Sequence, residues 1–319
     1  MIGSNDARNV IQACKICHGR EGSLQRFREM MFGSGRSYRY FLCAGCGCLQ
    51  LCDEVSSAEQ YPSGYYAYRP KLRGRFAAGL RRLRNRGVFR SRVLGWVAGL
   101  FAPDRMRGAE PWFRHLGLRA DSRILDVGCG TAELLRDLAD AGYCNVLGID
   151  PYLPRAVLAE LPSFVRAIPL DEVSGEYDVI MFHHSLEHMP DQEKVLRQAA
   201  KLLRPGGVCL VRIPVFPSFA WDRYRENWVQ LDAPRHLFVH SRKSLGIIAK
   251  QAGLEIERVD FDSTEFQFTG SELYSRGLAL SELERAFSRR ECRAFRRQAR
   301  QLNRDERGDQ AVFFLRKAG

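Results

Sequence analysis

One segment, residues 124–152, sets the architecture of this chain: Ile124-Leu-Asp-Val-Gly-Cys-Gly-Thr-Ala-Glu-Leu-Leu-Arg-Asp-Leu-Ala-Asp-Ala-Gly-Tyr-Cys-Asn-Val-Leu-Gly-Ile-Asp-Pro-Tyr152. The pattern predicts a short apolar strand, a glycine turn, a helix from about residue 132 and a second strand that ends in an acid. Gly128 and Gly130 allow a positive φ and a close approach of the main chain to a ligand, beside the unpaired N–H groups of the helix start. Asp150 follows Gly128 by 22 residues, where a carboxylate can accept hydrogen bonds from both ribose hydroxyls. The segment therefore predicts a nucleoside-binding unit.

The acid inside the turn separates two nucleoside cofactors. A dinucleotide-binding turn would place its third glycine at position 133, where this chain has Glu133. Asp126 suits a ligand with a cationic amino-acid tail better than a pyrophosphate. The residues therefore favour S-adenosylmethionine over NAD.

Four blocks carry a family resemblance: Asp126-Val-Gly-Cys-Gly-Thr-Ala, Asp150-Pro-Tyr, Tyr177-Asp-Val-Ile-Met-Phe-His-His-Ser-Leu-Glu-His-Met-Pro-Asp and Leu203-Arg-Pro-Gly-Gly. In order and spacing they resemble the class I methyltransferases, over roughly residues 110–265. The resemblance implies an α/β fold with a seven-stranded, mostly parallel, Rossmann-like sheet and helices on both faces. It also implies that the seventh strand is antiparallel and lies between the fifth and the sixth.

The same resemblance assigns the cofactor site. It places Asp126 and Gly128 at the methionine end, Asp150 at the ribose, and Leu170 and Asp171 at the rim of the adenine. Two of these acids have simpler interpretations, because Asp126 can cap the glycine turn and Asp171 can cap a short helix. The predicted cofactor-binding residues are Asp126, Gly128, Cys129, Gly130, Asp150, Pro151, Leu170, Asp171 and His183.

Strands and helices alternate along the second half of the chain, as in a doubly wound sheet. We expect strands at 123–127, 145–150, 164–168, 177–183, 208–213, 255–262 and 311–317, and helices near 132–141, 191–203 and 242–252. Residues 264–310 form a long helical insertion between the last two strands. Its arginines at 289, 290, 293, 296, 297 and 300 either bind phosphate or form a solvated helix face.

A cysteine module precedes this sheet. Cys14-Lys-Ile-Cys17 and Cys43-Ala-Gly-Cys46 are two CxxC pairs, which together predict a tetrahedral, structural Zn²⁺ site. About 60 residues with few large aliphatic side chains need such a metal to fold. Cys48 does not fit the turn and is excluded. An iron–sulfur cluster, or cysteines that are simply buried, are the alternatives.

The module also carries a resemblance of its own. Together with Tyr61-Pro-Ser-Gly-Tyr-Tyr-Ala-Tyr68, it looks like the zinc-bearing extension of methyltransferases from glycan and deoxysugar pathways. The tyrosines at 61, 65, 66 and 68 either lie over the substrate mouth or pack between domains.

Length and composition are those of a globular protein with a full core. Its 319 residues, 45% of them hydrophobic, can bury a full core. Neither a signal peptide nor a membrane-spanning run is apparent, so we expect a cytoplasmic protein whose ten cysteines are thiols or metal ligands.

Positive charge is concentrated in one segment. The net charge is +12, and residues 69–92 contain ten Arg or Lys and no acid, followed by an apolar run to residue 101. This segment, 69–101, predicts contact with an anionic membrane, nucleic acid or phosphorylated substrate, or else a solvated linker helix. Three parts result: a zinc-binding domain over 1–60, an aromatic and basic helical linker over 61–109, and a class I methyltransferase domain over 110–319 with the insertion at about 264–310.

Histidines are the candidate bases for removing a proton from a hydroxyl acceptor, because a neutral imidazole is available at cytosolic pH. The candidates are His236, in the segment Asp232-Ala-Pro-Arg-His-Leu, and His184 and His188 after the fourth strand. Relatives carry a comparable Pro-Arg-His-Leu segment. Strand alternation predicts that His183 and His184 face opposite sides of the sheet.

Together these features predict a methyltransferase that O-methylates a sugar, a glycan or a related small metabolite, which is free, nucleotide-linked or lipid-linked. Two alternatives remain. One is an RNA methyltransferase whose zinc module and arginine-rich helices bind phosphates. The other is a non-catalytic, zinc-containing scaffold.

Overall fold

The structure is a computed structural model that describes residues 13–60, 68, 112–113 and 115–318. The basic segment 69–101, nearly all of the predicted linker 61–109 and the tyrosines at 61, 65 and 66 lie outside the described residues. Within the described ranges, no helix has the length and apolar character needed to cross a bilayer.

The chain divides into two compact units, each assembled from three separate segments. The first unit contains the described residues of 1–60, 214–248 and 264–309. The second contains those of 61–213, 249–263 and 310–319. Two of the three segments of the first unit, 214–248 and 264–309, are thus insertions in the sequence of the second unit.

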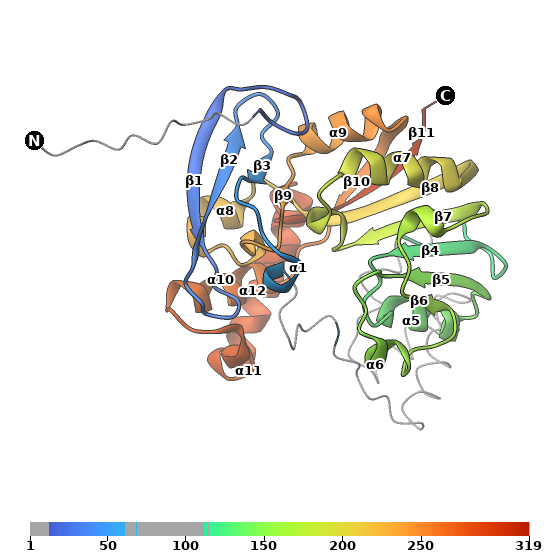
Figure 1. Cartoon of the computed structure of the whole chain (residues 1–319). Helices are drawn as coiled ribbons and strands as arrows, with labels where there is room; N and C mark the ends of the chain where they lie inside the picture. Colours follow the sequence, from blue (N-terminus) through green and yellow to red (C-terminus); the bar gives the residue numbers. More distant parts are fainter. Residues whose placement is uncertain (1–12, 61–67, 69–111, 114, 319) are drawn as a thin grey trace, which may run out of the picture. The chain divides into compact units, whose positions relative to one another are not determined.

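The second unit is built on a seven-stranded sheet with the order β10-β11-β8-β7-β4-β5-β6 (Figure 1). The strands from β4 to β8 pair in parallel, whereas β11 is antiparallel to β10. This confirms the predicted fold class, including the insertion of the last strand between the fifth and sixth. The strands are β4 (Arg123–Val127), β5 (Asn145–Ile149), β6 (Val165–Arg166), β7 (Tyr177–His183), β8 (Leu203–Pro214), β10 (Leu254–Phe261) and β11 (Gln310–Lys317).

Two strands differ from their predicted extents. β6 has only two residues, and β8 begins five residues before the predicted start at Val208. The residues before Val208, which include Gly206 and Gly207, were not predicted to belong to the strand. Instead Leu203 pairs with Tyr177, and a register shift before Val208 absorbs the extra residues.

Helices fill the connections between these strands. The helical elements are α5 (Glu133–Ala141), α6 (Arg155–Leu158), α7 (Gln192–Leu202) and the short 3₁₀ turns η2 (Leu170–Glu172) and η3 (Leu186–His188). α5 buries Leu135 and Leu138 completely against a core that includes Ile124 and Phe314. Helix α9 (Arg242–Gln251) carries the chain from the first unit into the second.

The strand order locates the ligand crevice of the second unit. From β4 the chain builds the sheet outward through β5 and β6, and then returns to place β7 and β8 on the other side of β4. In such a sheet, ligands bind beyond the carboxyl ends of the two strands at the switch point. Those strands are β4 and β7, which end at Val127 and His183.

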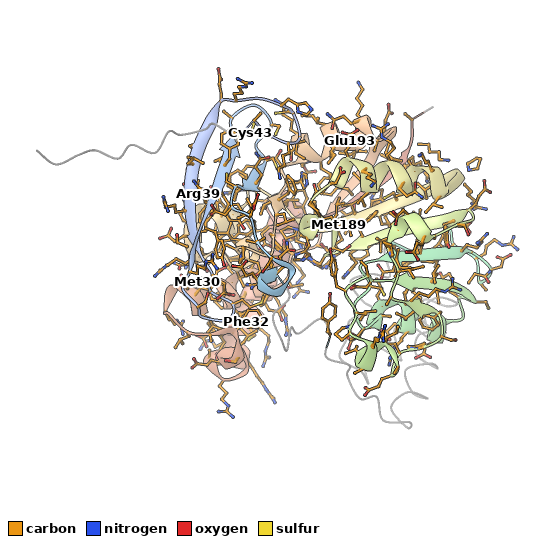
Figure 2. All side chains as sticks on the ribbon, viewed as in Figure 1. Met30, Phe32, Arg39, Cys43, Met189 and Glu193 are labelled. Carbon is orange, nitrogen blue, oxygen red and sulfur yellow. The ribbon has the colours of Figure 1, made fainter. Side chains whose placement is uncertain are left out.

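The first unit contains a four-stranded antiparallel sheet in the order β1-β2-β3-β9. β1 (Gly22–Arg28) and β2 (Ser37–Cys43) form a hairpin, and the short β3 (Leu49–Leu51) pairs with β9 (Phe238–Val239). Arg39, labelled in Figure 2, lies on β2 and forms an ion pair with Asp53 at 2.7 Å. The remaining elements are α1 (Ser57–Gln60), α8 (Phe219–Tyr224), η4 (Arg225–Asn227), η5 (Val229–Leu231), α10 (Phe266–Ser275), η6 (Leu280–Glu282), α11 (Leu283–Ala286) and α12 (Arg289–Arg304).

One core unites the three segments of the first unit. Phe27 and Tyr40 from the hairpin pack with Trp221 and Trp228 from the second segment and Phe268 from the third. The ring centroids of Phe27 and Trp221 are 6.0 Å apart in an edge-to-face arrangement. The prediction of a separate domain over residues 1–60 did not anticipate this shared core, because nothing in a CxxC pattern indicates which distant segment covers it.

Candidate functional site

The glycine turn after β4 has the geometry that a nucleoside site requires. Gly128 and Gly130 have φ angles of 77° and 50°, and the N–H groups of Gly128 and Cys129 both donate to the carbonyl of Ile149. Ser185 donates a hydrogen bond from its Oγ to the carbonyl of Val127 at 2.6 Å. A Cβ on Gly128 would lie 2.5 Å from the Cβ of Ser185. Glycine is therefore required at position 128, because its φ is positive and Ser185 leaves no room for a Cβ.

Asp126 is a buried acid with one carboxylate oxygen left unsatisfied by the described residues. It is 3% exposed, and its Oδ1 has no hydrogen-bond partner within the described part of the chain. Burial, reinforced by the charge of Asp150, raises the pKa of Asp126 to about 7. Such an oxygen fits the ammonium group of the methionine end of S-adenosylmethionine, because a cation would satisfy it and favour its ionised form. This orphaned oxygen argues against the interpretation of Asp126 as a simple turn cap.

Asp150 closes the opposite side of the turn. Its Oδ2 accepts from the N–H of Gly130 at 3.2 Å, and its Oδ1 accepts from the N–H of Tyr152 at 3.0 Å. Burial raises the pKa of Asp150, while these two bonds, the charge of His188 and a hydrogen bond from Tyr68 act in the opposite direction. Each carboxylate oxygen has lone pairs for more than one bond, so the acid is positioned to receive two ribose hydroxyls.

Other predicted cofactor residues surround these two acids less closely. Cys129 is half-buried, and burial raises the pKa of its thiol. Pro151 follows Asp150 directly and precedes the exposed ring of Tyr152. Leu170 and Asp171 form part of η2; Asp171 is exposed and does not cap the helix, since the cap position is Pro169. Their contact with adenine stays a prediction.

Two residues of this site were missed by sequence reasoning. Ser185 lies 58 residues after Val127, and only the pairing of β4 with β7 brings the two together. Tyr68 hydrogen-bonds Asp150 from a segment that the sequence linked to the acceptor. The cluster of tyrosines that includes Tyr68 was a signal for a functional role, but the sequence did not show that Tyr68 lies beside Asp150.

His183 and His184 contradict the predicted alternation. Their rings lie 5.3 Å apart, and the Nε2 atoms of both contact the guanidinium of Arg212. β7 ends at His183, and His184 adopts a left-handed backbone with φ of 54°, which cancels the alternation of a regular strand. The two side chains therefore face the same group rather than opposite sides of the sheet.

Arg212 organises a polar cluster beyond the ends of β7 and β8. Its Nε donates to Asp262 at 2.7 Å, and its guanidinium lies 5.4 Å from the ring centroid of Trp112. Burial and the charge of Arg212 lower the pKa values of His183 and His184 well below the ordinary range, so both rings are neutral. Since a guanidinium only donates, the Nε2 of His184 accepts from it, and its Nδ1–H faces Glu187 at 3.3 Å.

His236 belongs to the first unit and is 6% exposed. Its Nδ1 lies 2.8 Å from the carbonyl oxygen of Gln230, so the proton is on Nδ1 and Nε2 is the basic nitrogen. The hydroxyl of Tyr40 donates to the backbone carbonyl of His236 at 2.9 Å. Its neighbour Arg235 is 1% exposed and bound to Glu29 and Asp232. The loop that carries His236 is therefore rigid.

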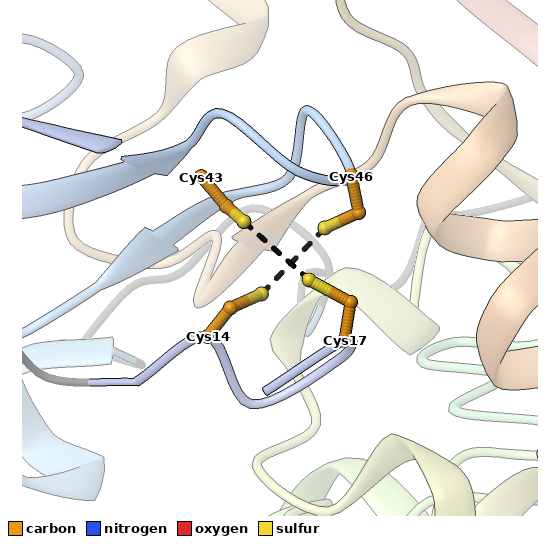
Figure 3. A group of neighbouring side chains, drawn as sticks. All are labelled: Cys14, Cys17, Cys43 and Cys46. Carbon is orange, nitrogen blue, oxygen red and sulfur yellow. Dashed lines mark hydrogen bonds between the residues drawn. The ribbon is translucent and has the colours of Figure 1, made fainter. Parts of the chain in front are cut away.

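The four predicted cysteines meet at one point. In Figure 3 the thiols of Cys14 and Cys17 approach those of Cys43 and Cys46 from two loops. The Sγ–Sγ distances are 3.6 Å for Cys14 and Cys46 and 3.5 Å for Cys17 and Cys43. A tetrahedral zinc thiolate site has sulfur–sulfur edges of about 3.8 Å, given Zn–S bonds of ~2.3 Å. The geometry therefore fits one Zn²⁺, and Cys48 and Cys52 lie outside the group.

The switch point of the sheet, the glycine turn and the two buried acids are the features expected of an α/β enzyme that binds a nucleoside with a cationic tail. Comparison with known proteins agrees. Residues 101–259 match the family described as methyltransferase domain. The ubiquinone biosynthesis O-methyltransferase of Bordetella avium is 37% identical over 164 residues, which cover 45% of this chain and 67% of the relative. The chain belongs to the S-adenosylmethionine-dependent methyltransferases.

Further similarities cover less of the other protein. The 27-O-demethylrifamycin SV methyltransferase of Amycolatopsis mediterranei is 36% identical over 33% of this chain and 40% of its own length. The ubiquinone biosynthesis O-methyltransferase of Bordetella bronchiseptica is 41% identical over 44% of this chain and 64% of its own length. The chain thus spans 40 to 67% of the length of these relatives. Among solved structures, mycolic acid cyclopropane synthase CmaA1 aligns with a TM-score of 0.45 and 17% identity, over 67% of this chain and 84% of that chain.

Proposed function

We propose that the protein transfers a methyl group from S-adenosylmethionine to a hydroxyl oxygen of a sugar, a glycan or a related small metabolite. The observation that carries O-methylation is the similarity to relatives named O-methyltransferases, at 37% identity over 164 residues. The sugar is supported by the cysteine quartet, which resembles the zinc-bearing extension of glycan and deoxysugar methyltransferases.

The second unit supplies the donor site in this proposal. When bound, S-adenosylmethionine supplies an electrophilic methyl group. Asp126 receives the ammonium of the methionine end, Asp150 receives the ribose, and the turn at Gly128 lets both approach the main chain. These contacts orient the donor for an in-line displacement, for which geometry is the main requirement.

Removal of the acceptor proton requires a general base, for which the sequence offers histidines. His184 is a weak candidate, because its Nε2 already accepts from Arg212 and its Nδ1 faces Glu187. In His236 the Nδ1–H donates to the carbonyl of Gln230, and Nε2 lies 3.9 Å from Oδ2 of Asp232, a carboxylate that can stabilise the imidazolium formed on proton uptake. We therefore keep His236 as the general base of the proposal, with its loop held by Tyr40 and Arg235.

The cysteine quartet is proposed to hold one structural Zn²⁺. Four thiolates leave no coordination position open, so the metal takes no part in methyl transfer. None of the ten cysteines of the chain, all of which the structure describes, forms a disulfide, which fits a reducing compartment such as the cytoplasm as the place of the reaction.

The test is mass spectrometry of purified protein incubated with donor and a panel of nucleotide-linked and free sugars. We expect a gain of one methyl mass on one class of sugar. The variant His236→Asn keeps a donor at the position of Nδ1 and removes the basic nitrogen, whereas His236→Gln places its amide near the position of Nε2. Both variants should retain calorimetric donor affinity, and turnover should fall by about 100-fold or more, the contribution of a general base.

Two results would count against this assignment. Full turnover by the His236→Asn variant would rule out His236 as the general base, but would not contradict methyl transfer to a sugar. Methyl incorporation into RNA, with none into any sugar, would replace the acceptor class altogether.

A further inference from the structure

Helix α12 (Arg289–Arg304) carries a stripe of arginines along one side. At about 100° per residue, all seven of its arginines fall within an arc of roughly 120°. All seven side chains are exposed. The arginine stripe consists of Arg289, Arg290, Arg293, Arg296, Arg297, Arg300 and Arg304.

The opposite side of the helix anchors it to the core of the first unit. Phe295 stacks on Phe268 with ring centroids 5.1 Å apart, and Ala299 and Leu302 are 1% and 7% exposed. A capping box at Ser288 and Glu291 fixes the start of the helix. The stripe is therefore a rigid array of charge and not a flexible basic tail.

Neighbouring acids neutralise little of this charge. Arg296 forms an ion pair with Glu265 at 2.6 Å, and Glu291 is occupied by the capping box. Among the described residues, Arg293 and Arg300 bond only to backbone carbonyls of the helix itself. Arginines spaced four residues apart repel one another, whereas an ordinary solvated helix face mixes charges of both signs. A partner of opposite charge would relieve this repulsion.

We propose that the arginine stripe docks the protein on an anionic lipid surface. The stripe runs along all 16 residues of the helix, and its end residues are about 22 Å apart along the axis, which is too long for one phosphate group and matches a row of headgroups. The apolar face of α12 is already packed, so the contact is electrostatic and involves no insertion of the helix. RNA is the less suitable polyanion, because the stripe presents no aromatic side chain on which a base could stack.

The experiment is co-sedimentation of the full-length protein with vesicles. One set contains phosphatidylcholine alone, and the other an equal mixture of phosphatidylcholine and phosphatidylglycerol. The test variant is Arg293→Gln, Arg297→Gln, Arg300→Gln. The matched control is Arg20→Gln, Arg26→Gln, Arg28→Gln, which removes the same charge from exposed arginines of the same unit.

We expect the unmodified protein to bind the anionic vesicles selectively. The stripe variant should lose about 10- to 100-fold in affinity, given a substantial contribution from each arginine near the surface, while the control changes less than about 3-fold. A lysine version of the stripe variant should retain binding. Thermal unfolding should show no loss of stability in the stripe variant, because like-charge repulsion is removed.

Three outcomes would overturn the proposal. The first is that the unmodified protein shows no preference for anionic vesicles. The second is that the control variant loses as much affinity as the stripe variant. The third outcome is a single-stranded RNA that binds through the stripe while vesicle binding is unaffected by its removal.

Discussion

Ser185 occupies the space that a side chain on residue 128 would need: a Cβ on Gly128 would lie 2.5 Å from the Cβ of Ser185. The same serine donates its Oγ proton to the carbonyl of Val127 at 2.6 Å. Ser185, which follows the two histidines at the end of β7, therefore packs directly against the glycine turn that follows β4. The shape of the donor site depends on both strands.

The first prediction concerns this contact. Gly128→Ala should lower the free energy of unfolding by about 2–4 kcal/mol, because an alanine at positive φ is strained and its Cβ overlaps Ser185. Donor binding, measured by calorimetry, should be lost. Gly253→Ala is a matched control, since Gly253 has the same φ of 77° and nothing within 4 Å of its Cβ position.

The clash itself can be tested separately. Adding Ser185→Gly to Gly128→Ala should recover part of the lost stability. Equal costs for alanine at 128 and at 253 would show that the backbone angle, and not Ser185, makes glycine necessary.

The second prediction follows from the pKa of Asp126, which burial raises to about 7 from 3.8. In the folded protein this acid holds its proton at a pH where the unfolded chain has released it, so it lowers stability progressively as the pH rises from about 4 to 7. Asp126→Asn should therefore gain stability relative to the unmodified protein over that range, by on the order of 1–3 kcal/mol. Urea denaturation at several pH values measures the difference.

Donor affinity should show the opposite consequence. A cationic tail binds the ionised acid, so affinity should fall about 10-fold per pH unit below pH 7 in the unmodified protein. Asp126→Asn should bind more weakly and without this dependence. A pH-independent affinity in the unmodified protein would remove Asp126 from the donor site.

The third prediction concerns Arg212. Arg212→Gln should lower the free energy of unfolding by about 2–4 kcal/mol, because Asp262 and the two histidines would lose the positive charge of the guanidinium that they contact. The pKa values of His183 and His184 should rise in NMR titrations but stay below the ordinary range, since burial is the larger cause of their lowering. Arg258→Gln is the control: its ion pair with Asp260 is 43% exposed at the arginine and should contribute less than about 1 kcal/mol.

The fourth prediction concerns the cysteine quartet. Elemental analysis should find one zinc per chain, lost in Cys14→Ser and retained in Cys48→Ser. Cys48 is a fair control because it is as buried as Cys14 but lies outside the group. Iron and acid-labile sulfide in place of zinc would establish the alternative of an iron–sulfur cluster.

Local patterns in the sequence predicted most of the strands and helices of the second unit. The predicted β4 and β7 coincide with the observed strands, because each is a mainly apolar segment, interrupted by one aspartate, that is followed by a turn or a polar segment. The CxxC spacing likewise selected the four cysteines that meet. In each case the information lies within a few residues of chain.

Relations between distant residues were the part that could not be predicted. The left-handed backbone of His184 is imposed by the chain's exit from the sheet, and a strand pattern does not show it. The contact of Ser185 with the glycine turn depends on strand order. The sequence also does not indicate that Arg235 pairs with the buried Glu29, which lies 206 residues away. Such contacts are set by tertiary packing, which propensity and periodicity do not encode.

The construction of the first unit from three segments has a consequence for biosynthesis. Leu49 of β3 pairs with Val239 of β9, 190 residues later in the chain. At typical translation rates the nascent chain emerges from the ribosome for about 10–40 s before that partner strand exists. During this interval the cysteine-bearing hairpin lacks most of its final neighbours. Besides the pairing of β2 with β1 and β3, capture of the proposed Zn²⁺ is a stabilising event that needs only residues already made. Metal supply during translation, rather than during turnover, should then limit the yield of folded enzyme.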